Sequence, residues 1–107
     1  MIVVNRFRVP ETETVAFRAD VERAHDTLAA QTGYVAGRVG RNVDDPELWL
    51  LSTEWADVGS YRRALSSYEV KLGAVPTLSR ALDEPSAYET LEDGAELNRF
   101  DARDTTR

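Results

Sequence analysis

The chain has 107 residues, which is enough for one domain with a single buried core. Acidic residues outnumber basic ones by 19 to 13 and no Lys/Arg-rich run occurs, so we expect no nucleic-acid partner. The absence of cysteine excludes disulfides, thiolate nucleophiles and cysteine-ligated metals. No apolar run reaches the roughly 18 residues of a membrane span, and no charged-then-apolar leader precedes the first strand. These features favour a cytoplasmic protein without a membrane partner.

The first predicted element is a strand. Residues 2–9 (IVVNRFRV) are rich in β-branched side chains and alternate along the chain. Asn5 and Phe7 share the more apolar face of this strand, because successive side chains point to opposite faces. Arg6 and Arg8 lie on the other face, where we expect them to need carboxylate or carbonyl partners.

A helix is predicted to follow the first strand. It should begin at Thr12 or Thr14, whose hydroxyls can cap it, and should run to about Gln31. Gly33 follows as the stop signal, in the position where a left-handed residue often ends a helix. The apolar stripe at helical spacing, which should face the core, consists of Phe17, Val21, Ala24 and Leu28.

Two further strands are predicted to form an antiparallel hairpin. Residues 34–43 and 48–55 (LWLLSTEW) have strand patterns, and the turn-rich residues 44–47 connect them. Gly37 and Gly40 indicate a bulge, a bend or a close approach by another backbone. Both faces of the third strand are largely apolar. We therefore expect helices on one face and the sheet of a second subunit on the other.

The remaining elements complete an α+β fold. A second helix is expected after Trp55, residues 70–82 are helical in pattern but interrupted at Pro76, and residues 87–91 form a last strand. The order βαββαβ predicts a ferredoxin-like domain with an antiparallel sheet over residues 1–91. Residues 92–107 read as a polar C-terminal tail.

Three segments of the sequence resemble a known family. VVNRFRVPETE, TGYVAGRVGRNVDDPELWLLSTEW and SYRRAL are similar, in order and spacing, to the antibiotic biosynthesis monooxygenase (ABM) family of the dimeric α+β barrel superfamily. The likeness covers residues 1–91. It implies a homodimer whose two sheets enclose a barrel-like interior. It also implies a cofactor-independent monooxygenase acting on a small polyketide- or quinol-type aromatic, because known relatives carry out such reactions.

Other relatives in this family degrade haem. The resemblance implies that they ligate the iron through a histidine after the third strand, supported by an asparagine in the first strand and by a tryptophan. Asn5 matches the asparagine position. However, no histidine occurs in residues 48–107, and Ala64 stands near the tryptophan position. Because a haem iron needs an axial donor, we predict a protein with no haem, no metal site and no other cofactor.

Three residues are candidates for catalysis. Cofactor-free oxygenation requires a largely apolar pocket, a base or hydrogen-bonding group, and stabilisation of a developing anion. The inward amide of Asn5 would position oxygen or the substrate anion, or would tie two elements together. His25, the only histidine, would act as a base or simply pack on the helix flank. Tyr61 would present its hydroxyl to the pocket or pack at its rim.

Four aromatic residues are candidates for substrate binding, namely Phe7, Trp49, Trp55 and Tyr68. Their rings would stack on an aromatic substrate, or would serve as core and interface residues. Tyr68 stands seven positions after Tyr61, so we expect both hydroxyls on one face of the second helix. A different class of function is also open, in which the chain is a non-catalytic dimeric protein that binds an aromatic metabolite in the same pocket.

Overall fold

The computed structural model describes residues 1–92, 96 and 97, so most of the predicted tail at 92–107 lies outside the described residues. The described elements, in chain order, are β1 (Ile2–Arg8), the 3-10 turn η1 (Glu11–Glu13), α1 (Thr14–Ala29), β2 (Tyr34–Arg41), β3 (Leu48–Trp55), α2 (Val58–Ser66), α3 (Tyr68–Gly73), α4 (Val75–Leu78) and β4 (Ala87–Tyr88).

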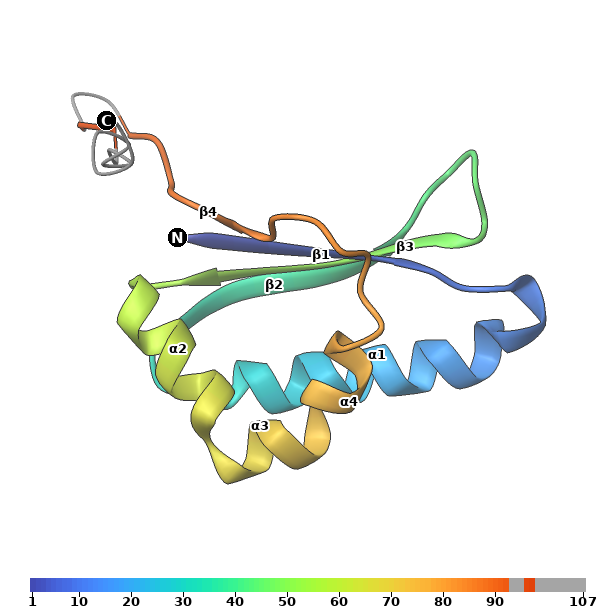
Figure 1. The fold of residues 1–107 in the computed structure, drawn as a ribbon, viewed down its shortest axis with the longest axis horizontal. Coiled ribbons are helices and arrows are strands. Elements are labelled where there is room, and N and C mark those ends of the chain that lie inside the picture. Colours follow the sequence, from blue (N-terminus) through green and yellow to red (C-terminus); the bar gives the residue numbers. More distant parts are fainter. Residues whose placement is uncertain (93–95, 98–107) are drawn as a thin grey trace, which may run out of the picture.

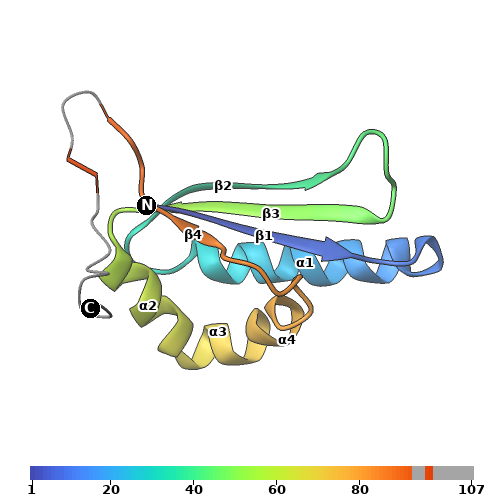
Figure 2. The same ribbon diagram turned by 45° about the horizontal axis from the view of Figure 1, so that its top comes forward.

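The four strands form one antiparallel sheet in the order β2-β3-β1-β4. All the described helices lie on one side of this sheet (Figures 1 and 2). This arrangement confirms the predicted ferredoxin-like α+β fold. The last strand is shorter than predicted because its pairing with β1 ends where Ile2, the first residue of β1, meets Tyr88.

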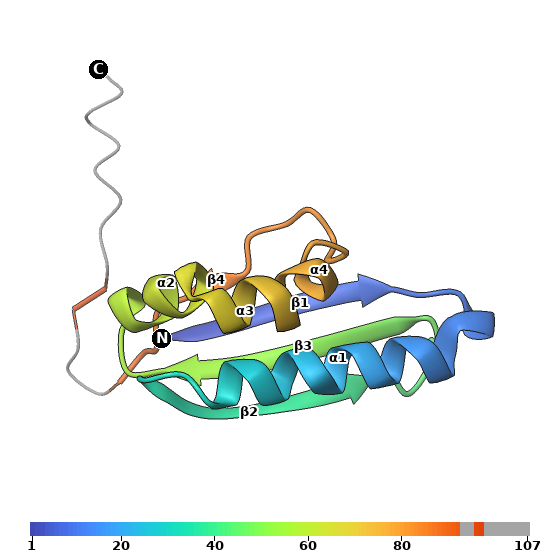
Figure 3. The ribbon, with the colours of Figure 1, turned by 90° about the horizontal axis from the view of Figure 1, so that it is seen from below.

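The core lies between the sheet and the helices. Seen from the helix side, α1 runs along β2 and β3, whereas α2, α3 and α4 lie over the half of the sheet that contains β1 (Figure 3). The predicted apolar stripe of α1 is buried in full, with Phe17 and Val21 at 0% exposure. None of the described helices is long and apolar enough to cross a membrane.

The ends of α1 differ in detail from the prediction. The helix begins at Thr14 after the η1 turn, and no side chain caps it, because the Thr14 hydroxyl instead donates to the Glu11 carbonyl at 2.8 Å. It ends at Ala29, two residues before Gln31. Gly33 follows in the left-handed conformation with φ 91°, which confirms it as the stop signal.

The helical region after β3 is divided into three short helices. Ser67 is extended (φ −71°, ψ 152°), and its hydroxyl accepts from the backbone N–H of Val70 at 3.2 Å, which starts α3. The expectation that Tyr61 and Tyr68 share one helix face is therefore wrong, because they stand on different helices. Pro76 lies in the first turn of α4, so the predicted interruption there is confirmed.

The sheet face opposite the helices is covered by no described element (Figure 1). Arg6 points from this face to Glu84, and its Nε and Nη2 atoms each donate to a carboxylate oxygen at 2.7 Å. Arg8 donates to Asp45 at 3.1 Å. Both arginines thus have the carboxylate partners that the strand pattern predicts. The apolar side chains on this open face are half-buried and comprise Ile2, Val4, Leu48 and Leu50.

Candidate functional site

Four aromatic rings from four different elements lie in contact at one end of the sheet. The ring centroids of His25 and Tyr34 are 5.9 Å apart, those of Tyr34 and Trp55 are 5.6 Å apart, and those of Trp55 and Tyr61 are 5.5 Å apart. These distances fall in the range of favourable ring pairs. We call this set the aromatic row. A cavity lies at each of its ends.

The first cavity, the α2 cavity, has a volume of about 710 Å³ and lies between α2 and the segment around β4. Its size lies within the range of small-molecule sites. The lining combines apolar and aromatic side chains with charged groups at its margin. These residues are Met1, Asp57, Val58, Tyr61, Arg62, Leu65, Ala87, Tyr88, Glu89, Thr90 and Glu92.

Tyr61 is the residue best placed to act in the α2 cavity. Its ring is half-buried against Trp55, and its hydroxyl makes no hydrogen bond with any described residue. Burial raises the pKa of Tyr61 above its ordinary value, because desolvation disfavours the phenolate. At neutral pH the hydroxyl therefore stays protonated and can donate a hydrogen bond to a ligand oxygen. Arg62 contributes a positive charge to the same lining.

Trp55 packs against the Tyr61 ring, with the two ring centroids 5.5 Å apart. It is 1% exposed, and its indole N–H donates to the hydroxyl of the buried Thr53 at 2.9 Å. The hydroxyl thus satisfies the polar atom of a large buried ring. Trp55 is held in place by this bond and by the two neighbouring tyrosine rings, so it acts on the cavity through Tyr61.

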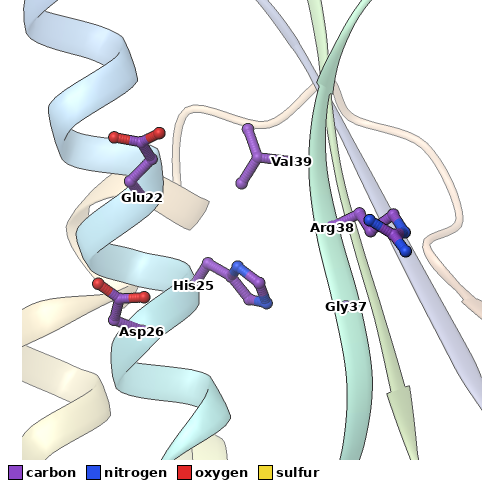
Figure 4. Close-up of a pocket in the computed structure, with 6 residues that line it drawn as sticks. All are labelled: Glu22, His25, Asp26, Gly37, Arg38 and Val39. Atoms are coloured by element: carbon purple, nitrogen blue, oxygen red, sulfur yellow. The ribbon is translucent and has the colours of Figure 1, made fainter.

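The second cavity, the His25 pocket, has a volume of about 440 Å³ and lies between α1 and β2. Figure 4 shows His25 reaching from α1 towards β2 at Gly37, whereas Arg38 points to the other side of the strand. The His25 Nε2 atom lies 2.7 Å from the Tyr34 hydroxyl. The remaining lining is polar and acidic on the helix side, with Glu22 and Asp26.

Gly37 makes room for the pair of His25 and Tyr34. A Cβ atom at Gly37 would lie 2.6 Å from the Tyr34 hydroxyl oxygen, 2.8 Å from His25 Nε2 and 2.8 Å from the Ser52 carbonyl oxygen. The glycine is thus explained by close approach, which is one of the possibilities that the sequence left open. At Gly40 no other atom lies within 4 Å of such a Cβ.

Tyr34 is the member of this site that the sequence pattern missed. Simple alternation places it on the sheet face of Ala36 and Arg38, away from the helices. The register of β2 shifts between Tyr34 and Ala36, and Tyr34 pairs with Trp55. The extra residue of a bulge moves a side chain to the other face, so Tyr34 joins the helix side. The glycines of β2 hint at such an irregularity, but they do not fix its position.

The family model for antibiotic biosynthesis monooxygenases matches residues 1–74. The chain belongs to this family. The structure is similar to that of SnoaB, a cofactor-independent oxygenase from Streptomyces nogalater, with 26% identity, a TM-score of 0.67 and coverage of 84% of this chain and 94% of SnoaB. It is also similar to a conserved protein from Methanosarcina mazei Go1, with 23% identity, a TM-score of 0.65 and coverage of 80% and 84%. No curated protein matches the sequence.

The other residues predicted to bind an aromatic substrate lie away from the aromatic row. Phe7 is fully buried in a second aromatic cluster with Phe17, at 5.2 Å, and Trp49 packs against Phe17 at 5.3 Å. The indole N–H of Trp49 has no partner among the described residues. Tyr68 is 73% exposed on α3 and lines neither cavity. Of the residues that the sequence selected as candidates, only Tyr61, Trp55 and His25 therefore belong to the aromatic row, together with Tyr34.

The histidine-ligated haem site of some ABM relatives has no counterpart in the α2 cavity. His25 is the only histidine of the chain, and its Nε2 is engaged with Tyr34 at the other end of the aromatic row. The described residues contain no group of three or more His, Cys, Asp or Glu side chains placed to hold a metal ion.

Asn5 lies between the two aromatic clusters. It stands opposite the buried Leu51, on the helix side of β1, and is half-buried. Its amide makes no hydrogen bond with any other residue that the structure describes, and it lines neither the α2 cavity nor the His25 pocket. Asn5 thus lies on the helix side of β1, as the alternation of the strand predicts. Its role in binding or catalysis stays a prediction.

Replacing Asn5 with leucine is expected to raise the free energy of unfolding by up to about 1 kcal/mol, because the half-buried amide makes no described hydrogen bond and leucine would bury additional apolar area on the helix side of β1. Urea unfolding would measure the change. Asn42→Leu is the matched control, since the Asn42 side chain accepts from the backbone N–H groups of Asp44 and Asp45 at 2.8 Å each and its loss should destabilise the turn. Lower stability of the Asn5 variant would show that the amide has a structural partner.

Proposed function

We propose that this chain is a cofactor-independent monooxygenase that oxidises a small polyketide- or quinol-type aromatic in the α2 cavity. The observation that carries the proposal is the half-buried Tyr61, whose hydroxyl has no partner among the described residues and which lines a cavity of about 710 Å³ with apolar, aromatic and charged side chains. Membership of the ABM family and the likeness to SnoaB, a cofactor-independent oxygenase, support the same reaction class.

The chemistry requires the substrate to react as an anion. Dioxygen reacts slowly with ordinary closed-shell molecules, but an electron-rich phenolate or carbanion can give it one electron. A CH2 group and O2 are then converted into a carbonyl group and water. A hydrogen bond from Tyr61 and the positive charge of Arg62 both favour the charged form of the substrate, so they lower its pKa inside the cavity.

We also propose that the protein works as a cytoplasmic homodimer. The apolar side chains of the open sheet face, including Val4 and Leu50, are half-buried within one chain and covered by no described element. Burying such a face against a second copy removes apolar area from water. In that arrangement α2, which carries Tyr61, stays on the helix side of each sheet.

Replacing Tyr61 with phenylalanine is expected to lower the rate of oxygen uptake by about 100-fold, as the loss of a single anion-stabilising donor does in other enzymes. The assay would follow dissolved oxygen with anthrone- and hydroquinone-type substrates, without added flavin, haem or metal. The wild-type protein should consume oxygen. Tyr68→Phe is the matched control, because it removes the same hydroxyl from an exposed position on α3 and should leave the rate unchanged.

Two other results would change the proposal. Saturable binding of the aromatic compounds without oxygen uptake would favour the non-catalytic binding protein. A Tyr61→Phe rate equal to that of the wild type would remove the Tyr61 hydroxyl from the reaction and leave the α2 cavity without its main donor.

A further inference from the structure

The open sheet face carries two opposite charges that have no partner in the described part of the chain. Arg6 and Arg8 on this face are paired with carboxylates of their own chain. Arg38 on β2 and Glu54 on β3, by contrast, form no ion pair and no side-chain hydrogen bond with any residue that the structure describes. Both side chains are exposed.

The strand register places these two charges close together. Arg38 stands opposite Ser52, and Glu54 follows Ser52 by two residues on β3, so all three side chains share one face. Figure 4 shows Arg38 pointing away from the helix side. Diagonal neighbours of this kind lie roughly 7–8 Å apart. Arg38 and Glu54 thus form a compact patch with one charge of each sign, which we call the bipolar patch.

A hollow of about 400 Å³ on the open sheet face is lined by both residues of the bipolar patch. The small residues Ala36, Gly37 and Ser52 contribute to its lining, and the apolar side chains of Ile2 and Leu50 border it. Apolar walls beside complementary charges are the composition of a protein interface. The shape and the charges of this face therefore favour a protein partner.

We propose that a second copy of the chain docks on the open sheet face in an orientation fixed by two ion pairs, each between Arg38 of one subunit and Glu54 of the other. The inference rests on the proposed homodimer and adds the residues that set its geometry. A two-fold axis that lies between the stacked sheets and passes between Arg38 and Glu54 forms both ion pairs at once. The same axis crosses the hollow, so the hollows of the two subunits face each other and their apolar walls leave water.

The bipolar patch fits a second copy because one chain offers both signs of charge. Hydrophobic burial is non-directional, so the apolar side chains of the open sheet face supply affinity without fixing an orientation. Charge pairs fix it, because like charges that meet in an interface are strongly unfavourable. Glu54 directly precedes Trp55, and Arg38 directly follows Gly37. The axis therefore crosses the sheet where its strands carry the aromatic row.

Charge reversal in the full chain tests the two ion pairs. Arg38→Glu leaves two negative charges in the bipolar patch, and Glu54→Arg leaves two positive charges. We expect the dissociation constant of each variant homodimer to rise by about 100-fold, as measured by sedimentation velocity, with an unchanged circular dichroism spectrum.

A mixture of the two variants distinguishes pairing between subunits from pairing within one chain. In a 1:1 mixture each Arg38→Glu chain meets a Glu54→Arg chain with opposite charges at both positions, so association should be restored. Native mass spectrometry should show heterodimers in large excess over either homodimer. The double variant, which exchanges the two charges within every chain, should dimerise like the wild type, and its failure to do so would overturn the proposal even if a single variant does not fold.

Lys71→Glu and Glu69→Arg are the matched controls, because both residues are exposed on α3 and neither forms an ion pair with a described residue. These changes should leave the assembly unaltered, alone and mixed. Dissociation caused by them would place the interface on the helix side and overturn the proposal.

Three results separate this inference from the proposed function. A dimer that persists in both charge variants, or a mixture with statistical proportions of the three dimers, would overturn the ion pairs and leave the homodimer standing. A monomeric wild-type chain would reject the homodimer and the ion pairs together. Failure of the oxygen-uptake assay would reject the enzyme activity alone, since none of these measurements depends on turnover.

Discussion

Replacing Gly33 with alanine is expected to lower the free energy of unfolding by about 3 kcal/mol. Gly33 has φ 91°, and a side chain in this left-handed conformation costs ~1–2 kcal/mol. A Cβ atom at this position would also collide with Cβ and Oγ of the buried Ser60 on α2, and overpacking of this kind costs typically ~1–3 kcal/mol. Urea unfolding followed by circular dichroism would measure the loss.

Gly59→Ala is the control for this prediction. Gly59 lies in the first turn of α2. The nearest neighbour of its added Cβ would be the flexible end of the Arg63 side chain, at 3.1 Å, and Asp57 Oδ1 would lie at an ordinary contact distance of 3.5 Å. Alanine should stabilise the helix here by up to ~1 kcal/mol. Equal stability of the Gly33 variant and the wild type would show that α2 can move away from the turn.

Replacing Leu50 with glutamate is expected to convert the proposed homodimer into monomers. Leu50 is half-buried on the open sheet face, so each subunit would place an unpaired carboxylate in the interface. An uncompensated buried charge costs ~3–5 kcal/mol, which corresponds to a dissociation constant at least about 100-fold higher. Sedimentation velocity across a range of protein concentrations would measure it.

The matched control for this variant is Val15→Glu, which introduces the same charge at a position on α1 that is 84% exposed. It should leave the assembly unchanged. A wild-type chain that sediments as a monomer would reject the homodimer itself. A Leu50→Glu chain that still dimerises would place the interface on another surface, such as the exposed side of α3.

The sequence predicts most of this fold because its elements have strong and consistent periodicity. The alternation in β1 and β3 and the apolar stripe of α1 each place side chains on the correct face. The division after Ser66 was missed, because a single serine cap at Ser67 ends one helix and begins the next. Local capping of this kind changes the direction of the chain without any change in hydrophobic pattern.

The candidate site was predicted less completely than the fold. Tyr61, Trp55 and His25 carry recognisable chemistry, so composition and spacing select them. Tyr34 depends on the bulge in β2, and its contact with His25 depends on the missing Cβ of Gly37. Such features arise from the tertiary arrangement of several elements. A single sequence shows which side chains are available, but it does not determine which of them meet.

Trp55 can also serve as an intrinsic fluorescence probe of this protein. The indole is buried, hydrogen-bonded to Thr53 and flanked by two tyrosine rings, so its emission depends on contacts with two other elements, β2 and α2. In a Trp49→Phe background it would be the sole indole fluorophore, since the chain has two tryptophans. A ligand that shifts Tyr61 should alter the intensity of this emission, whereas unfolding should move its maximum to longer wavelength. One spectrum would therefore separate occupancy of the α2 cavity from loss of the fold.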